Sequence, residues 1–210
     1  MRSNNMRAGA PYERFCTLFQ LSETEVVILA RTFLQVFPHA QVWRGDFSPT
    51  EPAIALIGAA EDFQLDVGTV QRRLAEMRPD RSNPQLRAPE TFWMNLVGIL
   101  EAADLPANEI RLNREDQPWI ELLGPMLHAG GSQETLFTGR RLQVWLEQVR
   151  LRSRDRLATL TGRESSAIAA GSVLAEMTLC LSEQNQVGAR AAQERLRQTL
   201  PIAAYRSLFP

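Results

Sequence analysis

Hydrophobic and polar residues follow two different periods along the first 60 residues of the chain. Residues 12–21 form a short stretch with closely spaced apolar side chains, at Phe15, Leu18, Phe19 and Leu21, and this stretch predicts a strand. Residues 22–37 place them at helical spacing, and Ser22 with Glu25 forms a capping-box pattern at the start. Pro38 ends this predicted helix. A second strand is predicted over residues 41–47.

An unbroken apolar run over residues 53–58 predicts a third strand, buried on both faces. The link before it, residues 48–52, contains two prolines and is too short for a parallel crossover. The second and third strands are therefore expected to form an antiparallel hairpin. A strand–helix–strand–strand unit of about 50 residues is small for a domain, which favours the tail of a larger sheet.

After residue 60 only helices are predicted, and they are separated by loops. The predicted helices are residues 66–77, 89–103, 136–160, 165–181 and 188–200, and residues 105–131 are expected to be largely irregular. We therefore divide the chain into a disordered start (1–10), a sheet unit (11–60), a helical and loop region (61–135) and a helical extension (136–210).

The amino-acid composition favours a soluble protein over a nucleic-acid-binding or membrane-spanning one. The chain is 44% hydrophobic and 22% charged with a net charge of −1, which is typical of a soluble protein and gives no reason to expect nucleic acid as a partner. Cys16 and Cys180 are far apart in sequence, so a cytoplasmic protein without disulfides is expected. The longest apolar run, residues 53–60, is much shorter than the roughly 20 residues of a membrane span.

Three segments resemble one enzyme family. They are residues 6–22, residues 31–47 (RTFLQVFPHAQVWRGDF) and residues 112–121 (LNREDQPWIE). Each is similar to a segment of bacterial spermidine synthase-like aminopropyltransferases, in the same order, and the resemblance covers about residues 6–125. The family reaction moves an aminopropyl group from decarboxylated S-adenosylmethionine to putrescine in polyamine biosynthesis.

The resemblance implies an α/β fold: a Rossmann-like, class I methyltransferase-like sheet, mostly parallel, with an antiparallel last strand. This chain would carry the last three strands and one crossover helix, followed by a mostly helical C-terminal region. The family's Gly-rich loop, ribose-binding acid and catalytic aspartates belong to earlier strands and have no counterpart here. We therefore expect a truncated, non-catalytic chain with no catalytic residue, no bound cofactor and no site for the family's donor.

The resemblance also has departures. Ala10, Phe15 and Thr17 stand where the family has Gly, Trp and Pro, next to the position of its substrate pocket, and Arg114 replaces a Thr. These changes put substrate binding by this chain in doubt even where a partner completes the sheet.

Three residues are candidates for binding a cationic amine substrate. Gln20 ends the first predicted strand, Trp43 lies in the second and Asp46 follows it. Each has a structural alternative: a solvated strand end, a core tryptophan and an aspartate that caps a turn. His39 and His128 have no neighbours in metal-ligand spacing, so no metal site is expected.

Three hypotheses of function remain open at this point. The first is an aminopropyltransferase-like fragment without activity of its own. The second is a non-enzymatic helical interaction module that retains part of a sheet. The third is one subunit of a split aminopropyltransferase, with an upstream half-enzyme as partner. A homo-oligomer formed through an open sheet edge is the other partner expected.

Overall fold

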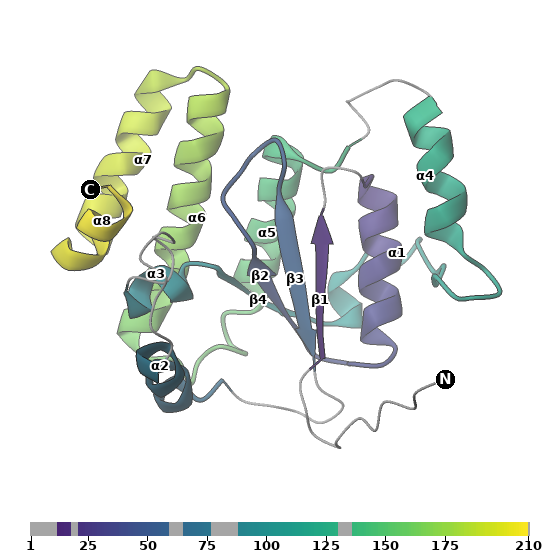
Figure 1. Cartoon of the computed structure of the whole chain (residues 1–210), viewed down its shortest axis with the longest axis horizontal. Helices are drawn as coiled ribbons and strands as arrows, with labels where there is room; N and C mark the ends of the chain where they lie inside the picture. Colours follow the sequence, from purple (N-terminus) through teal and green to yellow (C-terminus); the bar gives the residue numbers. More distant parts are fainter. Residues whose placement is uncertain (1–11, 18–20, 59–64, 77–87, 130–135, 210) are drawn as a thin grey trace.

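A computed structural model describes residues 12–17, 21–58, 65–76, 88–129 and 136–209 (Figure 1). Its centre is one four-stranded sheet in the order β1-β3-β2-β4, in which every neighbouring pair is antiparallel. The strands are β1 (Tyr12–Thr17), β2 (Ala40–Arg44), β3 (Ala53–Gly58) and β4 (Leu96–Leu100). The fold is therefore mixed α/β, and the predicted hairpin of β2 and β3 is confirmed.

The strands β1 and β2 point the same way, because both are antiparallel to β3, which lies between them. Helix α1 (Glu23–Leu34) connects them. It begins with the predicted capping box: Glu25 N–H donates to Ser22 Oγ at 3.3 Å, and Ser22 N–H donates to Glu25 Oε2 at 2.8 Å. Such a cap typically contributes about 1 kcal/mol, so the sequence itself fixes where the crossover helix starts.

The prediction of a helix over residues 89–103 is wrong. A short helix, α3 (Pro89–Trp93), is followed by the edge strand β4, which pairs with β2. The apolar residues of this stretch fit a helical stripe as well as a buried strand, and the free side of β2 decides between them. The expectation that only helices follow residue 60 fails for the same reason.

The remaining helices surround this sheet. They are α2 (Val67–Glu76), a 3₁₀ turn η3 (Ala102–Asp104), α4 (Trp119–Ala129), α5 (Gly139–Arg152), α6 (Gly162–Ser182), α7 (Gln186–Thr199) and α8 (Ile202–Leu208). The predicted helices near α2, α6 and α7 are confirmed. The region expected to be irregular contains α4, and α5 ends earlier than predicted because turns follow it.

Helices cover both faces of the sheet (Figure 1). On one face α1 and α5 pack against Val42, Leu56 and Val97. On the other face α3 and α6 pack against Trp43, Ala55 and Leu96, and α7 packs against α6. Among the described helices, α6 is the one long and apolar enough to cross a membrane, and much of it is buried in this second core. The C-terminal helices thus complete the covering of the sheet.

The outer edge of β4 is closed by side chains from the segment that follows α5. Ser153 is fully buried, and its Oγ accepts the N–H of Ile99 at 2.8 Å. The hydroxyl proton is shared between the carbonyls of Ile99 (2.8 Å) and Val149 (2.6 Å), and Arg156 Nη1 also donates to the Ile99 carbonyl at 3.0 Å. These bonds take the place of a neighbouring strand.

The outer edge of β1 is different. Within the described part of the chain, β1 pairs with β3 alone and is the terminal strand of the sheet. As far as the described residues show, the sheet therefore has one edge capped by side chains at Ile99 and one open edge at β1. The expected disordered start, residues 1–10, lies outside the described residues.

Candidate functional site

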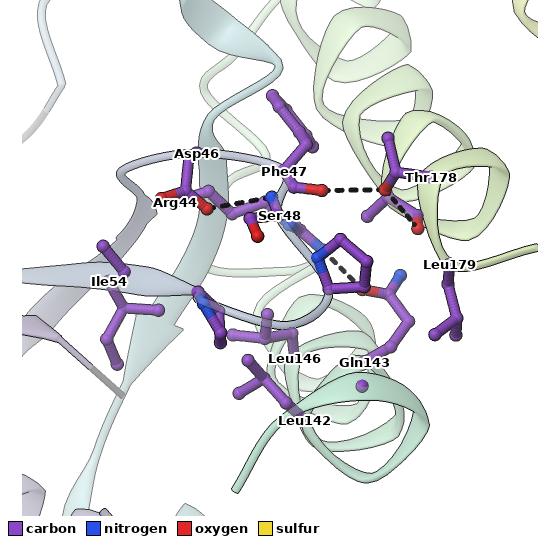
Figure 2. Close-up of a pocket in the computed structure, with 15 residues that line it drawn as sticks. Arg44, Asp46, Phe47, Ser48, Ile54, Leu142, Gln143, Leu146, Thr178 and Leu179 are labelled. Atoms are coloured by element: carbon purple, nitrogen blue, oxygen red, sulfur yellow. Dashed lines mark hydrogen bonds between the residues drawn. The ribbon is translucent and has the colours of Figure 1, made fainter. Parts of the chain in front are cut away.

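A small cavity lies where β2 ends, between the link to β3 and the helices α5 and α6 (Figure 2). Its volume of about 30 Å³ has room for one water molecule. Leu142 and Leu146 of α5 and Ile54 of β3 form its apolar wall. Its polar wall consists of Arg44, Asp46, Ser48, Gln143 and Thr178.

Arg44 is the unusual member of this cavity, because it is a charged side chain that is only 5% exposed. Its Nη2 lies 3.5 Å from Gln143 Oε1, a long contact, and its Nη1 is buried without a hydrogen-bond partner. No ion pair between described residues includes it. Burial lowers the pKa of Arg44 to about 10, and the charge of Glu147 partly opposes that shift. Its guanidinium carbon also lies 5.9 Å from the centre of the Phe47 ring, within cation–π range. Arg44 thus stays protonated at neutral pH and is compensated by weak contacts, without an ion pair.

Asp46 stands in the same cavity wall and holds the turn after β2. Its Oδ1 accepts the N–H of Ser48 at 2.9 Å, which is the geometry of an aspartate-capped turn (Figure 2). Desolvation raises the pKa of Asp46, while hydrogen bonds from the backbone of Ser48 and Ala53 oppose the rise. The loop is fixed from the other side by Thr178 of α6, whose hydroxyl donates to the Phe47 carbonyl at 2.8 Å.

Trp43 points to the opposite face of the sheet, away from this cavity. It is 8% exposed and packs against Phe92 and Trp93, with ring centroids 5.0 and 6.1 Å away. Its indole N–H donates to Gln41 Oε1 at 2.9 Å. The structure therefore places Trp43 in the core, as in its structural alternative. Gln20 lies outside the described residues.

Sequence reasoning did not single out Arg44 or Gln143 as site residues. A signal for Arg44 was present: side chains alternate along a strand, so Arg44 shares the core face of Val42, where a charge is unusual. No comparable signal exists for Gln143, which is 99 positions further along the chain.

A larger groove lies on the far side of Gln143, between α5, α6 and Arg195 of α7. Its volume is about 520 Å³. Gln143 is a wall of both spaces, and its Nε2 donates to the Ser172 carbonyl of α6 at 3.3 Å. The groove is lined by Arg140, Gln143, Val144, Glu147, Gln148, Arg150, Ala169, Ser172, Val173, Glu176, Leu179 and Arg195.

The arginines of this groove are paired with carboxylates. Arg150 Nε donates to Glu147 at 2.9 Å, and this bond is the main cause of the lowered pKa of Glu147. Arg195 pairs with Glu176 at 2.6 Å, and Arg140 pairs with Glu183 at 2.5 Å. Arg44 behind Gln143 is therefore the unpaired positive charge of this region.

The described residues contain no group of three or more His, Cys, Asp or Glu side chains that could hold a metal ion. Compared with known proteins, the chain matches no family model, no curated protein and no solved structure. The arrangement at hand is thus a buried, weakly compensated guanidinium beside a groove, with a turn aspartate and a glutamine between them.

Replacing Arg44 with methionine is expected to stabilise the protein. The change keeps most of the apolar stem and removes a buried charge, and such replacements are often neutral or stabilising by about 1–4 kcal/mol. Urea unfolding followed by circular dichroism measures it. Arg197→Met on the exposed face of α7 is the control and should change the unfolding free energy by less than about 0.5 kcal/mol. A loss of stability in Arg44→Met alone would mean that the charge is well compensated.

Proposed function

We propose that this chain is the C-terminal part of a spermidine synthase-like aminopropyltransferase fold, without catalytic activity of its own. The observation that carries the proposal is the order of the first three strands. β1 and β2 run parallel and are joined by α1, and the reversed strand β3 lies between them. A class I methyltransferase-like sheet ends in this way, which supports the family suggested by the three sequence segments.

The two sheet edges support the same proposal. In a class I methyltransferase-like sheet, the earlier parallel strands continue on the side of β1. That side is the open edge here, whereas Ser153 and Arg156 close the edge of β4. Within the described sheet, the strands that would bind the donor nucleotide therefore join best at the outer edge of β1.

The residues of the chain fit a non-catalytic part of such an enzyme. The Gly-rich turn and the acidic residue that hold a nucleotide ribose have no counterpart in the sequence. Trp43 is committed to core packing and Asp46 to the turn after β2. Because both side chains have these structural roles, neither is available to bind an amine substrate in the isolated chain.

The purified chain is expected to show no binding of methylthioadenosine or decarboxylated S-adenosylmethionine. Titration calorimetry measures this, with an intact aminopropyltransferase as the positive control. Micromolar binding by the isolated chain would contradict the proposal, because it would require a donor site within these 210 residues.

Hydrogen exchange tests the open edge directly. In the isolated chain, the β1 amides that point away from β3 are expected to exchange fast, while the Ile99 amide, bonded to Ser153 Oγ, exchanges slowly. Co-expression with the polypeptide encoded immediately upstream should slow the outward β1 amides and leave Ile99 unchanged. Uniform protection of β1 in the isolated chain would show that this edge is already occupied.

A non-enzymatic interaction module is the second candidate, and one observation favours it. Helices cover both faces of β2, β3 and β4, and one edge is closed, so the chain has much of what an independent domain needs. Light scattering of the purified chain, with and without the upstream polypeptide, distinguishes these functions. A monomer that does not bind the upstream polypeptide favours the interaction module, whereas a one-to-one complex favours a split aminopropyltransferase.

A further inference from the structure

We propose that the groove between α5 and α6 binds a small organic monocarboxylate with an apolar body, whose carboxylate pairs with Arg44. The proposal is independent of the aminopropyltransferase reading, because it depends only on the side chains around Gln143. It assigns a role to a buried guanidinium that contacts Gln143 and the Phe47 ring but has no carboxylate partner among the described residues, and whose Nη1 makes no hydrogen bond.

The charges around the groove favour one negative group. Arg140, Arg150 and Arg195 are each bonded to a carboxylate of the protein. Arg44 adds one positive charge that has no ion pair, with Nη1 buried and free of hydrogen bonds. A carboxylate at Nη1 would form a charge-assisted bond there, about twice as strong as a neutral one.

Gln143 and Leu179 line both the cavity that contains Arg44 and the groove, and the Gln143 side chain is weakly held. Its amide oxygen lies 3.5 Å from Arg44 Nη2, and its amide nitrogen lies 3.3 Å from the Ser172 carbonyl. Both contacts are at the long end of the hydrogen-bond range. A change of side-chain rotamer at Gln143 would open the path. One oxygen of the incoming carboxylate would then replace Gln143 Oε1 at Nη2, and the other would bind the unpartnered Nη1.

The rest of the groove selects the body of the ligand. Val144, which is 52% exposed, lies on the α5 side, and Ala169 and Val173 lie on the α6 side. A volume of about 520 Å³ is within the range of small-molecule sites. Arg44 can pair with one negative group, and a further one would meet only Glu147, Glu176 and arginines that are already paired, which is why we infer a monoanion rather than a di- or triacid.

The probe for this site is 4-(trifluoromethyl)benzoate, followed by ¹⁹F NMR line broadening during titration with the full chain. We expect saturable binding, and no binding of the matched neutral amide, 4-(trifluoromethyl)benzamide. Arg44→Met should weaken the benzoate affinity at least about tenfold, because it removes a charge-assisted bond. Ala169→Leu should weaken it by filling the groove, and Arg197→Gln on exposed α7 should leave it unchanged.

Three results of this titration would overturn the proposal. Equal binding of the benzamide, or undiminished binding by Arg44→Met, overturns the proposal. Absence of benzoate binding at millimolar concentration also overturns it, and leaves a single water in the cavity of about 30 Å³ as the partner of Arg44. If Arg44→Met fails to fold, the benzamide comparison tests the charge and Ala169→Leu tests the groove, since Ala169 lines the groove and not the cavity.

Discussion

Replacing Gly171 with alanine is expected to destabilise the protein by about 3 kcal/mol or more, in the upper range for overpacking. A Cβ at this position of α6 would lie 1.9 Å from the carbonyl oxygen of Met94 and 2.8 Å from its carbonyl carbon. These are backbone atoms between α3 and β4, so no side chain can rotate away. The helix itself would have to move off the sheet, which would open the core around Trp93 and Leu96. The urea midpoint measures the loss.

Gly162 provides the matched control in the same helix. A Cβ there would meet nothing within 4 Å, and the residue begins α6. Gly162→Ala is therefore expected to be neutral, or to stabilise by about 0.4–1 kcal/mol through the unfolded state. Equal effects at the two glycines would show that helix propensity, and not the contact with Met94, governs the result.

Replacing Ser153 with alanine is expected to cost about 1–3 kcal/mol, the usual penalty for an unsatisfied buried polar group. The hydroxyl serves the N–H and the carbonyl of Ile99 together. Arg156 continues to serve the carbonyl after the change, but the N–H is left without its acceptor. Faster exchange of the Ile99 amide should accompany the lower unfolding free energy.

Ser166→Ala is the control for this substitution. Ser166 lies on the exposed side of α6, and its hydroxyl donates to the carbonyl of Gly162 at 2.7 Å. Removing it is expected to change the unfolding free energy by less than about 0.5 kcal/mol. If Ser153→Ala behaves like Ser166→Ala, the β4 edge does not depend on the hydroxyl.

Local patterns in the sequence predicted the parts of this fold that local physics decides. The capping box at Ser22 and the unbroken run of β3 are each recognisable from a few consecutive residues, and both are confirmed. The strand β4 was not predictable in this way. Its apolar residues suit a helix or a strand, and the choice depends on pairing with β2, far back along the chain.

The candidate site also contains one part that depends on neighbouring residues and one that depends on residues far apart in the sequence. The role of Asp46 is local, because its carboxylate caps an N–H two residues away, and the sequence allowed that turn as an alternative. The cavity depends on Arg44 meeting Gln143 across 99 positions, after α5 has packed on the sheet. No spacing in one sequence encodes such a meeting.

The unequal edges of the sheet also limit how this protein can associate with itself. A strand-forming edge on each side would let one molecule add to the next without end, as in a fibre. Here Ser153 and Arg156 occupy the outward N–H and C=O of Ile99 in β4, whereas no partner is seen on the outer side of β1 among the described residues. Among the described strands, two copies that join through β1 leave no second edge of that kind. Strand pairing through β1 therefore favours a two-fold symmetric dimer over a filament.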